Sequence, residues 1–167
     1  MSNKLFRVEI LQPRFNELYE EYLSLFGEEN NDLNSNFTKK TLFPNSLIES
    51  LPTDVGEICK EFNFSFSLNK PFSSMLLLRR LLPLSIVRKF QKMGKENEIK
   101  QDGDYFDTKV LLGKVQIYLK EKRVYEEIIS YKLLLDSSQH SYTFHPVITD
   151  VEGAAVKLRL LLEDIFT

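Results

Sequence analysis

The stretch from Pro71 to Gly94 limits the possible folds more than any other part of the sequence. Proline suits the first turn of a helix and glycine the position just beyond its end, so these residues bound a helix of about 22 residues and about 33 Å. Pro83 lies inside it, removes one amide N–H and crowds the preceding turn, so we expect a kink there or a division into two helices. One face of this spine helix is expected to carry Phe72, Met75, Leu76, Leu82, Ile86, Phe90 and Met93.

Four further helices are predicted around the spine helix. Thr53 is the expected N-cap of the first, Asp107 caps the second, the third begins near Val124, and Thr149 with Glu152 forms a capping-box pattern before the last. Their expected apolar positions are Val55, Ile58, Cys59, Phe62 and Phe66 in the first, Val110, Leu111, Val115, Tyr118 and Leu119 in the second, Ile128, Ile129, Leu133 and Leu134 in the third, and Val151, Ala154, Ala155, Leu158, Leu161, Leu162 and Ile165 in the last.

Strand patterns are nearly absent. The only candidates are residues 4–11 and 141–148, and Asp102, Gly103 and Asp104 mark a loop. The polar run 136–141 is expected to end the helix that begins near Val124. We therefore predict an all-α protein, an up-and-down helical bundle of five to six helices.

Length and composition fit one globular domain. The chain has 167 residues, of which 43% are hydrophobic and 28% charged, and its single cysteine, Cys59, excludes an internal disulfide and is expected in the core. We divide it into residues 1–46, with a helix from Pro13 to Phe26, a stop at Gly27 and then a polar loop, and residues 47–167, the bundle. The N-terminal helix either packs on the bundle or arms a second subunit.

Charge and hydropathy exclude several classes. The net charge of -2 gives no general reason for non-specific binding to nucleic acid. The basic residues of 88–123 alternate with acidic ones, which favours a solvated surface over a phosphate-binding track. The sequence has no run of 18 apolar residues and no secretory signal pattern, so we expect a soluble protein of the cytoplasm that does not enter membranes.

The common signatures of enzymes do not occur, and one polar cluster remains. Its members, near the end of the helix from Val124, are Lys132, Asp136, Ser137, Ser138, His140, Tyr142 and His145. His140 can serve as a general acid or base, although a lone loop histidine is more often a simple hydrogen-bonding residue. Asp136, His140 and His145 are usable metal ligands, but no cysteine and no second carboxylate on the same helix joins them. We expect neither a metal nor a cofactor.

Two adjacent arginines, Arg79 and Arg80, interrupt the apolar part of the spine helix. Arg79 lies on or close to the apolar face, and burying its charge without a partner would cost several kcal/mol. We therefore predict that at least one of the pair contacts a carboxylate or backbone carbonyls. The contact either holds helices in register or forms part of a ligand site.

The order of these features resembles the HEPN superfamily, in particular HEPN-like domains of unknown function in bacterial and mobile-element proteins. The resemblance rests on Leu51-Pro52, a helix with Glu57 and Glu61, the stretch 75–82, Asp136-Ser-Ser-Gln-His140 and a closing helix. It covers residues 47–167 and implies a helical bundle that often dimerises. Its active members are metal-independent endoribonucleases of defence systems, in which four to six residues separate an arginine from the histidine that follows it. Arg79 or Arg80 would match the arginine of the long helix, and His140 the histidine.

The ribonuclease motif is broken in this sequence. Leu133, Leu134 and Leu135 occupy the arginine positions before His140, and the nearest cation, Lys132, is one residue too far. Lysine cannot reproduce the bidentate guanidinium. In addition, Pro83 replaces a glutamate that often follows the long-helix arginine in HEPN-like families.

Two functions follow as expectations. The first is a non-catalytic HEPN-like module that forms a homodimer or binds a protein partner in a defence or mobile-element context, using the apolar surplus of Leu160, Leu161 and Leu162, which cannot all face one core. The alternative is a metal-independent endoribonuclease acting on RNA, with His140 and Lys132, or with Arg79 or Arg80, as its catalytic groups. A domain that binds a small ligand or nucleotide is the remaining class.

Overall fold

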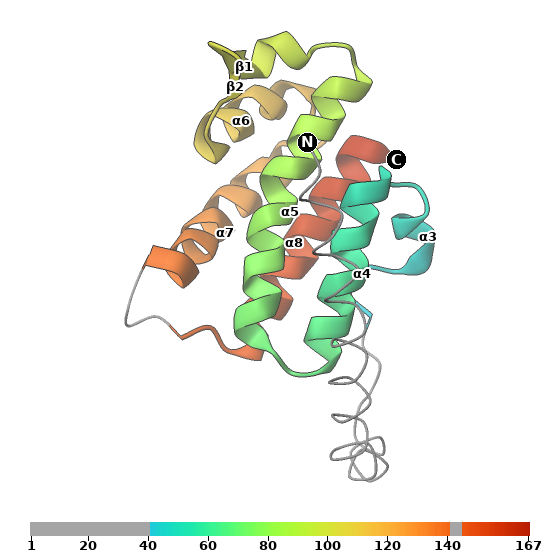
Figure 1. Ribbon diagram of the computed structural model, residues 1–167, viewed down its shortest axis with the longest axis vertical. Helices are drawn as coiled ribbons and strands as arrows, with labels where there is room; N and C mark the ends of the chain where they lie inside the picture. The colour runs from blue at the N-terminus through green and yellow to red at the C-terminus, as the bar shows by residue number, and fades with distance from the viewer. Residues whose placement is uncertain (1–40, 141–144) are drawn as a thin grey trace, which may run out of the picture. The chain divides into compact units, whose positions relative to one another are not determined.

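The computed structural model describes residues 41–140 and 145–167 and shows the expected all-α bundle (Figure 1). The predictions for the N-terminal helix, the strand at 4–11, Gly27, most of the polar loop and Tyr142 lie outside these residues. In chain order the elements are α3 (Asn45–Ile48), α4 (Thr53–Ser67), α5 (Pro71–Lys92), η1 (Glu96–Ile99), β1 (Lys100–Gln101), β2 (Asp104–Tyr105), α6 (Thr108–Val115), η2 (Gln116–Tyr118), α7 (Lys122–His140) and α8 (Ile148–Phe166). Within the described ranges, no helix is long and apolar enough to cross a membrane.

Helix α5 is the spine of the bundle, as predicted. It packs against α4, α6, α7 and α8 and runs through the middle of the view in Figure 1. The helix continues through Pro83, so of the two alternatives predicted there, a kink or a division into two helices, the division is wrong. Met75, Leu82, Ile86 and Phe90 are buried and Met93 is partly buried against the core, whereas two expected core residues, Phe72 and Leu76, are exposed. Leu76 lies about 100° around the helix from Met75 and so points away from the buried face.

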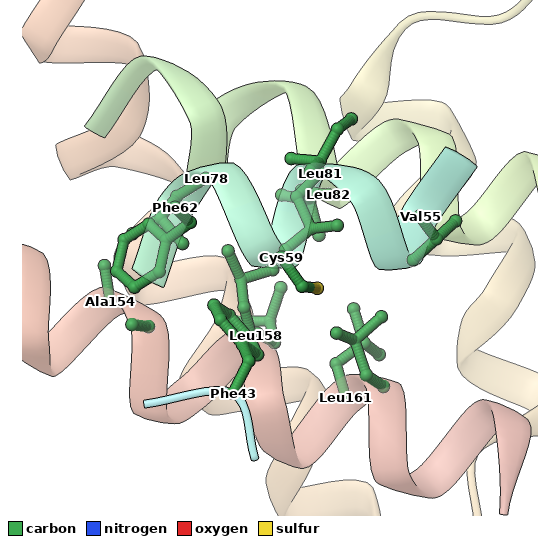
Figure 2. Close-up of a cluster of buried hydrophobic side chains, with 14 of the residues drawn as sticks. Phe43, Val55, Cys59, Phe62, Leu78, Leu81, Leu82, Ala154, Leu158 and Leu161 are labelled. Atoms are coloured by element: carbon green, nitrogen blue, oxygen red, sulfur yellow. The ribbon is translucent and has the colours of Figure 1, made fainter. Parts of the chain in front are cut away.

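The core begins before the predicted boundary at Leu47. Leu42 and Phe43, ahead of α3, are buried, and the ring of Phe43 meets that of Phe62 edge to face with centroids 5.1 Å apart. The amide of Asn63 fixes this segment, because it accepts the Phe43 N–H at 3.1 Å and donates to the Phe43 carbonyl at 2.7 Å. Figure 2 shows Phe43 in one cluster with residues of α4, α5 and α8.

Cys59 lies inside the same cluster, as predicted (Figure 2). Its side chain is fully buried, and burial raises the pKa of the thiol to about 12. The neutral thiol therefore behaves as a small apolar residue at the interface of α4 with the rest of the core.

In the helices other than α5, most predicted core positions are confirmed, and two of the described side chains are exposed instead. All seven positions predicted for α8 and all five predicted for α4 are buried. Val110 of α6 and Ile129 of α7 are exposed. In each helix an adjacent residue faces the core instead: Leu111 in α6 and Ile128 in α7. Successive helical residues point about 100° apart, so adjacent apolar residues cannot share one buried face.

Helix ends agree less well with the sequence. The Asp107 cap is confirmed, since its carboxylate accepts the Val110 N–H at 2.9 Å. Thr53 is the first helical residue rather than the N-cap, and Pro52 holds the cap position. Thr149 is likewise inside α8, which begins one residue earlier. The cap residue is Val147, and its N–H donates at 3.1 Å to Asp150 and not to Glu152.

Two further elements differ from expectation. Helix α7 does not end at Asp136 but continues to His140, and residues 145–147 of the second strand candidate form no strand. The expected loop at Asp102–Asp104 is the tip of a small antiparallel hairpin, in which Lys100 pairs with Tyr105. Asp102 and Gly103 have φ values of 54° and 94°, and two consecutive positive φ values are typical of the tight turn that closes such hairpins.

Candidate functional site

One ion cluster joins α5 to α7 and contains three of the predicted site residues. The carboxylate of Asp136 accepts a hydrogen bond from Lys132, one turn earlier on α7, and lies 3.7 Å from Nε of Arg79 on α5. The side chains of Arg79 and Asp136 are 28% and 36% exposed. The prediction that an arginine of the pair meets a carboxylate is therefore confirmed for Arg79.

The other predicted site residues are placed only in part. Arg80 is exposed on α5, and His145 is exposed ahead of α8. Ser138 and His140 belong to the last turns of α7, but their side chains, like that of Ser137, lie outside the described part. Among the described residues, no three His, Cys, Asp or Glu side chains gather in a way that could hold a metal ion.

A shallow hollow of about 330 Å³ opens beside the ion cluster. Its walls are Leu76, Arg79, Arg80 and Pro83 of α5 and Thr108, the first residue of α6. The sequence indicated both arginines, but it assigned Leu76 to the core and gave no reason to notice Thr108. The meeting of α5 with the start of α6 is a tertiary contact, and no local pattern encodes it.

A longer groove lies between α7 and α8. Two adjoining hollows of about 290 and 170 Å³ share Glu121, Val124 and Leu160. Leu160 is 39% exposed, and Val156, one turn earlier on the same helix, is also exposed. Leu161 and Leu162 are buried, which confirms that the leucine run cannot all face the core.

Charged side chains rim this α7–α8 groove and are paired with one another. Glu127 accepts hydrogen bonds from Lys157 of α8 and from Arg123, whose Nε is 2.7 Å away, and these bonds hold the pKa of Glu127 below its ordinary value. At the other end the carboxylate of Asp164 accepts the backbone N–H groups of Lys120 and Glu121, at 2.9 and 3.2 Å. The groove therefore has an apolar floor and an ordered polar border.

A separate ion pair joins α4 to α5 and yields a pH-dependent prediction. Nε of Arg88 donates to Asp54 at 2.8 Å, and this hydrogen bond and the charge of Arg88 hold the pKa of Asp54 below 3.8. Because both side chains are more than a third exposed, we expect Asp54→Asn to lower the free energy of unfolding by at most about 1 kcal/mol at neutral pH.

That difference should shrink as the pH falls below 3.8. A depressed pKa in the folded state stabilises the protein above the unfolded pKa, and the contribution is lost as the pH falls through the folded value. Urea unfolding of the wild type and Asp54→Asn at neutral and acid pH measures the effect. An equal difference at both pH values would contradict the assignment.

Comparison of the sequence with models of protein families, with curated proteins and with solved structures finds no match. The resemblance to HEPN domains therefore stays a prediction. The helical fold and the contacts above are properties of this chain itself and are not inferred from a relative.

Proposed function

We propose that this chain is a non-catalytic helical interaction module that pairs with a second copy of itself through the α7–α8 groove. The observation that carries the proposal is the exposure of Leu160 and Val156 on a helix whose other apolar residues mostly face the core. Val124 and Leu160 give the groove an apolar floor, and its charged rim is ordered. An apolar centre with a polar border is the usual composition of a protein interface.

The charge pattern of α8 favours a second copy in antiparallel orientation. Lys157 lies on the N-terminal side of Leu160, and Glu163 and Asp164 lie on its C-terminal side, and each of these side chains is partly exposed. A two-fold axis near Leu160 would bring Lys157 of each copy towards Glu163 of the other, in addition to the Glu127 and Arg159 that these side chains already contact within the chain, whereas a parallel arrangement would place like charges together. A two-fold interface uses the same patch on both subunits, so one stripe supplies both halves.

The ion cluster at Asp136 supports a non-catalytic role. The Asp136 carboxylate accepts a hydrogen bond from Lys132 and lies next to Arg79. Two cations expected to stabilise a phosphate in a ribonuclease therefore have a carboxylate beside them. Lys132, the cation expected to act with His140 in a ribonuclease, is therefore paired within α7 and is not available to an RNA phosphate. In the defence context that the HEPN resemblance implies, such a module would act by binding.

Light scattering over a series of protein concentrations tests the pairing. We expect the wild type to form a dimer and Leu160→Glu to remain a monomer, because the carboxylate would be buried without a partner at the centre of the interface. Ile117→Glu is the matched control, since Ile117 is 77% exposed on η2 and lies outside the groove. A wild type that stays monomeric, or a dimer unaffected by Leu160→Glu, would overturn the proposed pairing.

A cleavage assay tests the non-catalytic part of the proposal. Metal-free wild type is incubated with a mixed pool of single-stranded RNA, beside His140→Ala at matched oligomeric state. We expect no cleavage by either protein. Cleavage by the wild type that is lost in His140→Ala would instead establish the endoribonuclease alternative.

A further inference from the structure

We infer that the hollow formed by Arg79, Arg80 and Thr108 is a binding site for a small phosphorylated molecule. The site lies on α5 and α6, uses none of the residues that line the α7–α8 groove, and does not depend on the pairing proposed above. The argument rests on the local charge, the positions of the hydrogen-bond donors and the apolar part of the wall.

The hollow and its immediate surroundings carry an excess of positive charge. Arg79 and Arg80 line it, and Lys132 joins Arg79 at the single carboxylate of Asp136. Three cations against the carboxylates of Asp136 and Asp107 leave one positive charge, although the whole chain has a net charge of -2. Asp107, next to Thr108 in sequence, does not line the hollow, and its carboxylate accepts the Val110 N–H inside the first turn of α6.

The donors suit a phosphate group. A guanidinium offers parallel N–H groups that match two phosphate oxygens, and Arg80, which is exposed on α5, can present them, whereas Arg79 lies against Asp136 and adds its charge to the site. Thr108 adds a hydroxyl at the first position of α6, where the helix dipole places partial positive charge. These groups come from two different helices, so the packing of α6 on α5 is needed to assemble them.

The apolar wall suits the rest of the ligand. Leu76 is exposed and Pro83 partly exposed, and both line the hollow beside the arginines. A volume of about 330 Å³ lies at the small end of ligand sites, where clefts of roughly 300 to 1,000 Å³ are usual. The site therefore fits a phosphate monoester whose organic part is about the size of one aromatic ring or sugar.

Calorimetric titration with phenyl phosphate tests the inference. We expect saturable binding to the wild type and at least about tenfold weaker binding to Arg80→Gln, because a charge-assisted hydrogen bond is lost. Arg123→Gln is the matched control, since it removes the same charge from a side chain that is 83% exposed on α7 and lines the other groove. It should bind phenyl phosphate like the wild type.

Two further probes examine the two parts of the site. Inorganic phosphate should bind more weakly than phenyl phosphate, and Leu76→Ala should reduce that difference, because the apolar contact is removed. No saturable binding of phenyl phosphate, or equal weakening by Arg80→Gln and Arg123→Gln, would overturn the site. A 5′-phosphorylated RNA oligonucleotide that displaces phenyl phosphate at far lower concentration would overturn the assignment to a small molecule.

Discussion

Phe43→Ala is expected to lower the free energy of unfolding by about 3 to 5 kcal/mol. The side chain is fully buried ahead of α3 and contacts Phe62 edge to face, so truncation leaves a cavity and removes an aromatic pair. The effect would show that the folded unit begins before α3. Urea unfolding followed by circular dichroism measures it.

Phe64→Ala is the matched control for that substitution. Phe64 is 68% exposed on α4, so the same change should alter the free energy of unfolding by no more than about 0.5 kcal/mol. Similar losses in the two variants would mean that the segment at Phe43 does not belong to the core.

Leu158→Ala is expected to cost about 2 to 5 kcal/mol of stability. Leu158 lies in the middle of α8 among residues of α4 and α5, where it is almost completely buried (Figure 2). The C-terminal helix α8 packs against the spine helix α5, and Leu158 lies on the side of α8 that faces the core. Thermal and urea unfolding give the change in stability.

Leu160→Ala tests the exposed face of the same helix. Because Leu160 lies in the α7–α8 groove and not in the core, its removal should leave the stability of the monomer nearly unchanged while weakening self-association. A stability loss equal to that of Leu158→Ala would place Leu160 in the core and contradict the orientation of α8.

The sequence predicted the buried face of α8 completely because local pattern and tertiary packing agree there. Its apolar residues recur at helical spacing, and one side of the helix meets the spine. The same reasoning failed for Phe72 and Leu76, because a helix surrounded by several others has no single face that its own sequence defines. Which of its apolar residues stay exposed depends on where the neighbouring helices cross it.

Helix α7 shows a second limit of prediction from sequence. The polar run after Leu135 favours a helix end by composition, yet the helix continues to His140. Asp136 is engaged there by Lys132 within the helix and by Arg79 from α5, so a tertiary ion pair stabilises a turn that local preference disfavours. The hairpin at Asp102 and Gly103 was missed for a simpler reason, since strands of two residues carry no detectable alternation.

The candidate site was predictable in its charges but not in its assembly. The cost of burying a guanidinium predicted that Arg79 or Arg80 contacts a carboxylate or backbone carbonyls, and the contact of Arg79 with Asp136 confirms it. The sequence could not show that Thr108 would join the arginines, or that residues at the start of α7 would form a groove with Leu160. Both depend on how helices distant in sequence approach each other.

The single thiol, that of Cys59, can report how often the bundle opens. The chain has one cysteine, and packing covers it completely, so a thiol reagent in solution meets no reactive group while the bundle is closed. The rate of modification, divided by the rate for an exposed thiol, therefore measures how often α4 separates from the core. The opening of the bundle can therefore be followed in the native sequence, with no engineered label.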